Sequence, residues 1–329
     1  MLVPRERLPP SFAERHAALR DYFCDKDADA TEVEDGWALS LGWPDGVERH
    51  VDPRLDEGLV WWGGGARRDT MAIARRREGR VLRALYDSWT LQSWSEWLAR
   101  RGTPPNPLTI LHVDDHEDLG SPRLFGDTDN WTDAISGERV SLASPRSVEA
   151  AIESGGIGMG SFLTPFLHAL PHCDVRQLRQ PPKSRATIDY KVVLTTTPDT
   201  LIAPGRARPA IALAKTTEAP GPGRMRITPD LNAWLADIGP GPILLHIDMD
   251  YFNNRYDGDS DWESRREPFD PDADTVLKSI DAMADALNAR GLIERLEDLV
   301  VAFSPGFFPA ELWALADARL KNRLKALYG

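Results

Sequence analysis

The chain has 329 residues, of which 42% are hydrophobic and 11 are Trp, so it is long enough for one large domain or two modest ones. Its net charge of −12 argues against nucleic acid and anionic membrane surfaces as partners and favours a cationic substrate. Cys24 and Cys173 are too few for a disulfide framework or a Cys-rich zinc site, and without a signal pattern or a membrane-length apolar run we expect a soluble, cytoplasmic protein.

Residues 1–79 are predicted to form an N-terminal arm and a β-rich extension. Two runs of alternating hydrophobicity, 37–43 and 47–51, flank Asp45-Gly46, a dipeptide typical of β-hairpin turns. The sequence therefore predicts a hairpin with its turn at this dipeptide. The other elements expected in this region are a short helix at 12–22, a third strand at 59–62 and a turn at 63–65.

Residues 80–329 are predicted to form an α/β domain, because expected strands and helices alternate along them. Such alternation favours a mainly parallel sheet with helices on both faces, which is a three-layer α/β/α arrangement. The segment 198–224 is rich in Pro, Gly and Ala and is interpreted as a loop. Strands are expected near 108–113, 190–196, 243–247 and 299–303, and helices near 80–101, 145–154, 160–170, 228–238, 272–290 and 309–327.

Two carboxylate-rich motifs directly follow apolar runs. Asp-Asp-His-Glu-Asp at 114–118 follows the run 108–113, and Asp-Met-Asp at 248–250 follows the run 243–247. An apolar run of this length is typical of a buried strand. Either motif alone could be a helix cap or a solvated loop. Carboxylates gathered at the rim of a core need cations to neutralise them, so the two together indicate a metal site.

The two motifs offer four carboxylates and one imidazole. Active sites of open α/β sheets form outside the carboxyl ends of the strands, and side chains at i and i+2 of an extended chain share a face. Four negative charges balance two dications, and oxygen and imidazole ligands suit Mn²⁺, with Zn²⁺, Fe²⁺ or Co²⁺ as alternatives. Two such ions would activate water as a nucleophile. The predicted metal ligands are Asp114, His116, Asp118, Asp248 and Asp250.

The motif at 114–118 resembles the Asp-x-His-x-Asp motif of the ureohydrolases, the arginase and agmatinase superfamily, and 248–250 resembles their Asp-x-Asp motif. The flanks, 112–119 and Phe303-Ser304-Pro305, look more like a ureohydrolase-like family that includes the peptide arginases of ribosomal natural-product pathways. The resemblance covers about residues 80–310. It implies an arginase-like fold, two Mn²⁺ ions per chain, and conversion of arginine side chains within a precursor peptide to ornithine and urea.

The resemblance also implies a role for each ligand. Asp114 and Asp248 would bridge the two metals. Asp118 would complete the coordination of one metal and hydrogen-bond the bridging hydroxide. His116 and Asp250 would hold the other metal.

One ligand of the superfamily has no counterpart in this sequence. Ureohydrolases usually supply a further His from a segment upstream of the first motif, but no His lies between Val51 and Leu111. Asp87, in Tyr-Asp-Ser-Trp at 86–89, is at about the right distance along the chain to replace it. The position could instead be open.

Four histidines outside the ligand set are candidates for supporting roles. His112 and His246 each stand two residues before the leading Asp of a motif, which favours paired roles in orienting the ligands. Each could equally be a hydrogen-bonded core histidine. His168 and His172 are candidates for a proton shuttle to the leaving amine, although a histidine at a helix end needs no such role.

Recognition of a guanidinium calls for a carboxylate, which can bind it through two hydrogen bonds. Glu311 is the candidate, because it begins a helix just past the last predicted strand; a Glu in a first helical turn is also a common capping choice. The segment 251–262 extends from the second motif, and its amides and acids could line the pocket or form a solvated loop. These side chains include Asn253, Asn254, Asp257, Asp259 and Asp261.

The sequence thus predicts a binuclear manganese hydrolase of guanidino groups, with an arginine-containing peptide as substrate and its oligomeric state left open. Four alternatives remain. They are a single-zinc deacetylase-type amide hydrolase, a phosphoesterase, a small-molecule guanidino hydrolase and a non-catalytic binding protein. A phosphoesterase would want basic residues near the metals, and few lie beside the motifs.

Overall fold

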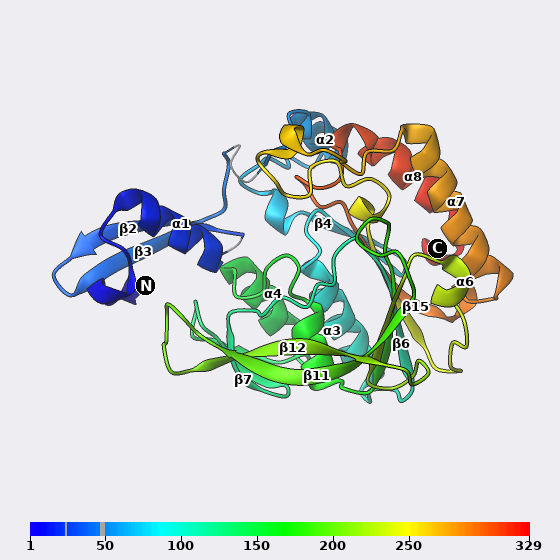
Figure 1. Ribbon diagram of the computed structural model, residues 1–329, viewed down its shortest axis with the longest axis horizontal. Coiled ribbons are helices and arrows are strands. Elements are labelled where there is room, and N and C mark those ends of the chain that lie inside the picture. The colour runs from blue at the N-terminus through cyan, green and yellow to red at the C-terminus, as the bar shows by residue number, and fades with distance from the viewer. Residues whose placement is uncertain (24, 47–49) are drawn as a thin grey trace.

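The computed structural model describes residues 1–23, 25–46 and 50–329, and a nine-stranded sheet forms its centre (Figure 1). Across the sheet the strands are β12 (Ala207–Thr216), β11 (Ile188–Pro198), β13 (Arg224–Thr228), β10 (Cys173–Leu178), β6 (Leu108–Val113), β14 (Ile243–Asp248), β15 (Leu296–Ala302), β5 (Val81–Ala84) and β4 (Arg75–Glu78). The strands from β13 to β5 are parallel, and antiparallel strands flank them. The predicted mainly parallel sheet is confirmed.

Helices cover both faces of this sheet, so the main body has three layers (Figure 1). On one face α3 (Trp89–Arg101) packs beside α4 (Pro145–Ser154) and α5 (Leu163–Ala169); the Trp94 ring meets Phe166 edge-on, with centroids 4.8 Å apart. On the other face lie α6 (Leu231–Trp234), α7 (Ala273–Ala289) and α8 (Trp313–Arg323), with α2 (Leu55–Trp62) against α8. This is the α/β/α layering that the alternation of elements predicts.

The local sequence explains these elements. Every residue of β6 and β14 is buried, as expected for central strands covered on both faces. In α7 the Asp272 carboxylate caps the helix by accepting a hydrogen bond from the Thr275 N–H at 2.8 Å. Val276, Ile280 and Leu287 follow at helical spacing and form a buried apolar face of this helix.

A smaller N-terminal unit has a core of its own. It consists of β1 (Leu2–Val3), α1 (Phe12–Phe23), β2 (Asp27–Val33) and β3 (Gly36–Gly42), with strand order β1-β3-β2. Leu201, from the turn between β11 and β12, packs into this core and ties the unit to the main sheet. A third small sheet contains β7 (Leu124–Asp127), β8 (Asn130–Asp133) and β9 (Arg139–Val140).

Two predictions about the first 79 residues are wrong. The hairpin is formed by β2 and β3, with its turn at Glu34-Asp35 rather than at Asp45-Gly46; residues 47–49 of the predicted second strand lie outside the described residues. Residues 59–62 belong to α2, not to a strand. Leu55, Leu59 and Trp62 are buried at i, i+4 and i+7, so the apolar residues follow the helical period. β4, which also precedes residue 80, belongs to the large sheet.

Two predictions within the main body are also wrong. The helix expected from residue 80 begins only at Trp89, because Val81–Ala84 forms β5. The segment 198–224 is not a single loop, because it contains β12, which pairs with β11 from Asp189↔Thr216 to Pro198↔Ala207. Cross-strand pairing here overrides an Ala- and Pro-rich composition that is unfavourable for strands. Two strands, β10 and β13, were not predicted, and α6 is shorter than the helix predicted at 228–238.

Among the described residues, no helix combines the length and the apolar character that crossing a membrane requires.

Candidate metal centre

Neighbouring parallel strands bring the two motifs to one edge of the sheet. β6 and β14 pair so that Val113 lies opposite Ile247, and Asp114 and Asp248 therefore leave the sheet next to each other. β15 lies beside β14, and β5 lies beside β15. The chain that leaves β5 carries Asp87 to the same edge. The strand-end rule predicts this convergence.

The structure brings together all of the predicted metal ligands: Asp114, His116, Asp118, Asp248 and Asp250. The four carboxylates are buried, each at most 5% exposed. The ligand atoms of Asp114, His116 and Asp250 lie within 4.8 Å of one another. A second group with the same spacing contains His112, Asp114, Asp118 and His246.

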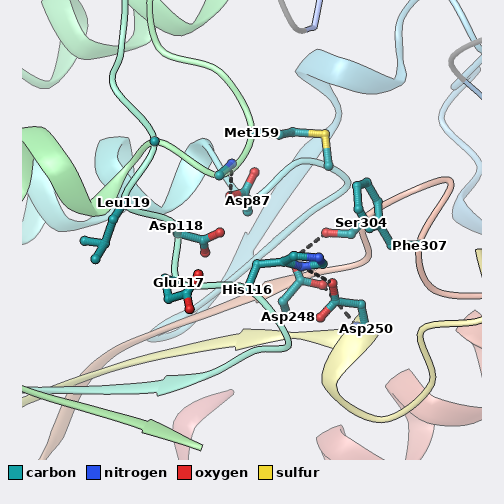
Figure 2. A pocket seen from close by; sticks show the side chains of 12 residues that line it. Asp87, His116, Glu117, Asp118, Leu119, Met159, Asp248, Asp250, Ser304 and Phe307 are labelled. Atoms are coloured by element: carbon teal, nitrogen blue, oxygen red, sulfur yellow. Dashed lines mark hydrogen bonds and ion pairs between the residues drawn. The ribbon is translucent and has the colours of Figure 1, made fainter. Parts of the chain in front are cut away.

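The cluster lines a cavity of about 430 Å³, a size that is usual for small-molecule sites. Figure 2 shows the carboxylates of Asp118, Asp248 and Asp250 beside the His116 ring. Met159 and Phe307 add apolar surface to the same cavity. The pocket therefore combines a charged floor with apolar flanks.

Three carboxylates surround the His116 ring. Its Nδ1 is 2.8 Å from Asp250 Oδ2 and 3.6 Å from Asp114 Oδ1, and its Nε2 is 2.9 Å from Asp257 Oδ1. Burial alone would lower the pKa of His116. Asp250 and the other nearby carboxylates nevertheless hold this pKa well above its ordinary value. A positive charge at this ring relieves repulsion between acids, which is the demand that a metal cation would also meet.

Buried polar atoms that lack a hydrogen-bond partner, here called orphaned, indicate whether the cluster fits a cation. Asp87 Oδ1, Asp114 Oδ2 and Asp118 Oδ2 are buried and have no hydrogen-bond partner among the described residues. The other oxygen of Asp87 accepts a hydrogen bond from the Gly160 N–H at 2.7 Å. Buried carboxylate oxygens without partners are costly unless a cation coordinates them. The residues present therefore fit a divalent metal.

Electrostatics lead to the same conclusion. Burial, followed by the charge of Asp114, raises the pKa of Asp250 to about 6. Burial and neighbouring carboxylates likewise raise the pKa of Asp118 and of Asp248 well above their ordinary values. Asp114 differs, because the adjacent His112 and His116 hold its pKa well below the usual range in spite of burial. The acids resist ionising together unless positive charge is supplied.

Asp87 is the carboxylate upstream of the first motif that the sequence offers as an additional ligand. Asp87 is fully buried and lines the cavity. Burial raises the pKa of Asp87, and the negative charge of the nearby Asp114 raises it further. One candidate metal position is formed by Asp114 and Asp118, with Asp87 and Asp248 lining the cavity beside them. The second is formed by Asp114, His116 and Asp250.

His112 and His246 lie beneath the carboxylates as a stacked pair, with ring centroids 5.2 Å apart. His246 Nδ1 is hydrogen-bonded to the Thr90 hydroxyl at 2.9 Å, and its Nε2 lies 3.4 Å from Asp114 Oδ2. His112 Nε2 lies 3.6 Å from both Asp114 Oδ2 and Asp118 Oδ2. Burial lowers the pKa of His112 to about 4. Both rings are placed to orient the ligand carboxylates.

Three predicted residues do not line this cavity. Glu311 pairs with Arg255, its Oε1 lying 2.6 Å from the Arg255 guanidinium. His168 Nε2 lies 3.0 Å from the carbonyl oxygen of Ala210 in β12. His172 is exposed just before β10, at the end of that strand opposite to the metal ligands.

Other residues at the site escaped the sequence analysis. Ser304 follows β15 and its hydroxyl donates to Asp248 Oδ2, Gly160 donates to Asp87, and Glu117 lines the cavity. A signal existed for Ser304, since its Ser-Pro step follows a buried strand. No signal in the sequence marks Lys183, because it stands in a Pro-rich loop far from both motifs.

Among known proteins, no family model matches this chain, and no curated protein matches it. The assignment of a metal centre therefore rests on the side chains themselves. They are buried carboxylates and histidines at adjacent strand ends, and three of the buried carboxylate oxygens have no hydrogen-bond partner among the described residues.

Proposed function

We propose that this chain is a metal-dependent hydrolase of guanidino groups with an arginase-like fold. It would convert arginine residues of a precursor peptide to ornithine with release of urea. The two motifs resemble those of the ureohydrolases, and the layered α/β architecture is compatible with that family. The observation that carries the proposal is the set of orphaned carboxylate oxygens at Asp87, Asp114 and Asp118.

When bound, divalent metal ions would lower the pKa of water and so supply a nucleophile at neutral pH. The buried Asp118 carboxylate would accept a proton from the water as the water oxygen bonds to the guanidinium carbon, and would return that proton to the leaving amine. The bond between the guanidinium carbon and the side-chain nitrogen breaks. The products are urea and the amine of ornithine.

The lining of the cavity favours a cationic substrate group. Glu117 is its one carboxylate outside the proposed ligand set among the described lining residues, and it already pairs with a guanidinium, that of Arg179. We assign guanidinium recognition to Glu117 because Glu311 lies outside the lining. Phe307, whose ring centroid is 5.4 Å from that of His116, offers an aromatic face for a planar cation.

The same lining supports a peptide rather than free arginine as substrate. The described residues that line the cavity include no Lys and no Arg, so the lining offers the carboxylate of a free amino acid no basic side chain other than the His116 ring. An arginine within a peptide presents no such carboxylate. Mn²⁺-dependent urea release from an Arg-containing peptide tests the proposal, and urea release from free arginine alone would contradict the peptide assignment.

A second candidate is a single-metal amide hydrolase of the deacetylase type. The observation that favours it is the compact group His112, Asp114, Asp118 and His246, which could hold one zinc ion. The stacked histidines would then be ligands rather than supports. One metal per chain, with amide but not guanidine hydrolysis, would favour this candidate.

A further inference from the structure

The His116 ring is held on the side that faces away from the proposed metals. A nitrogen that binds a metal must carry no proton, so binding through Nδ1 requires the ring proton to reside on Nε2. That nitrogen lies 2.9 Å from Asp257 Oδ1. Asp257 is thus placed to accept a hydrogen bond from Nε2–H and to fix both the tautomer and the orientation of the ring. Lys183 Nζ also lies 3.0 Å from this nitrogen, but two carboxylate oxygens, Asp257 Oδ1 and Asp115 Oδ2, lie closer to its ammonium.

The Asp257 carboxylate is itself fixed by a network. Lys183 Nζ lies 2.7 Å from Asp257 Oδ1, and the Asn254 amide donates to the same oxygen at 2.9 Å. Arg265 donates to the other oxygen. Lys183 also lies 2.9 Å from Asp115 Oδ2, so it connects the loop that follows β14 with the motif that follows β6.

The backbone of the loop that follows β14 packs against the segment that follows β15. Asp257 has a φ of 51°, in the left-handed region, and Gly258 follows with a φ of 64°. A Cβ at Gly258 would lie 2.7 Å from the Phe307 ring, and the Gly258 N–H donates to the Gly306 carbonyl oxygen at 3.0 Å. This packing leaves little freedom for Asp257 to move away from His116.

We infer that Asp257, held by Lys183, is a positioning residue that prepares His116 to bind the second metal. This inference rests on the two-metal site of the proposed function. Asp257 is not itself a metal ligand, because the Lys183 ammonium already neutralises it and it lies outside both groups of candidate ligands. Carboxylate–histidine–metal arrangements of this kind sharpen metal affinity by fixing the ring.

Titration with Mn²⁺, followed by calorimetry and by electron paramagnetic resonance, tests the inference in the full-length protein. We expect Asp257→Asn and Asp257→Ala to bind the first Mn²⁺ as the wild type does and the second roughly 10–100-fold more weakly. At two equivalents the wild type should give the spectrum of a coupled pair, whereas the variants should show isolated Mn²⁺. Asp261→Asn, an exposed change of equal charge in the same loop, should behave as wild type.

An Asp257→Ala variant that binds both ions with wild-type affinity would overturn the inference. So would loss of both ions from a variant whose near-ultraviolet circular dichroism is unchanged. If neither Asp257 variant folds, Lys183→Met carries the test, and an unaltered second site in that variant would contradict the inference. A wild type that binds two ions but releases no urea would contradict the proposed function alone.

Discussion

The Asp87 carboxylate accepts a hydrogen bond from the Gly160 N–H at 2.7 Å through one oxygen, while its other oxygen is buried without a partner among the described residues. Gly160 has a φ of 68°, a left-handed conformation that favours glycine. The loop before α5 therefore aims Asp87 at the carboxylates that follow β6 and β14. This supports Asp87 as a ligand in the proposed metal centre.

If the proposal is correct, Asp87→Ala should reduce the bound Mn²⁺ from two ions to one per chain, because only the metal that Asp87, Asp114 and Asp118 would share loses a ligand. Asp87→His should retain two ions, since it restores the ligand type that is usual in the superfamily. Metal analysis after gel filtration measures both. Two tightly bound ions in the alanine variant would show that Asp87 is not a ligand.

Glu117→Gln should raise KM for an arginine peptide about tenfold or more while kcat changes little, because a hydrogen bond between charged groups contributes about 1.5–3 kcal/mol. Steady-state kinetics measure the two constants separately. Glu311→Gln is the matched control, because Glu311 pairs with Arg255 away from the cavity. If Glu311→Gln raises KM and Glu117→Gln does not, guanidinium recognition belongs to Glu311.

In the metal-free protein, the contribution of Asp250 to the free energy of unfolding should decrease as the pH rises. Burial raises the pKa of Asp250 to about 6 from 3.8, so between these values the folded chain holds a proton that the unfolded chain has released. The free energy of unfolding of the wild type minus that of Asp250→Asn should therefore fall from about pH 4 to about pH 6. Urea denaturation in the presence of a chelator measures this difference. A difference that increases with pH would contradict the electrostatic account.

Gly58→Ala should destabilise the packing of α2 against α8. A Cβ there would lie 2.6 Å from the Trp313 ring and 2.8 Å from Ala310 Cβ, and overpacking of this kind costs about 1–3 kcal/mol. Urea denaturation measures the loss. Gly42→Ala, where a Cβ would meet nothing within 4 Å, should change stability much less. Equal stabilities of the two variants would contradict the packing described for α2.

The strand-end carboxylates could be predicted because each motif follows an apolar run, which became the fully buried β6 and β14. Parallel neighbours then place Asp114 beside Asp248 by geometry alone. Asp257 and Lys183 could not be predicted in their roles, because their contacts with His116 join segments 67 and 141 residues apart in sequence. No local pattern encodes such contacts.

The edges of the sheet were harder to predict than its centre. β12 is rich in Ala and forms by pairing with β11, so its own composition does not predict a strand. Residues 59–62 of α2 were predicted to be a strand, because this short run is apolar throughout. The helical period becomes visible only when the buried Leu55 is included. Short apolar runs do not distinguish the two structures until their burial partners are known.

The number of Mn²⁺ ions bound per chain tests the central claim most directly. Metal-depleted protein titrated with Mn²⁺ should take up two ions, and Asp118→Asn and Asp250→Asn should each weaken one of them. Saturation at two ions should coincide with the appearance of urea from an arginine peptide. Binding of no metal, or of a single zinc ion with no effect of Asp250→Asn, would contradict the account.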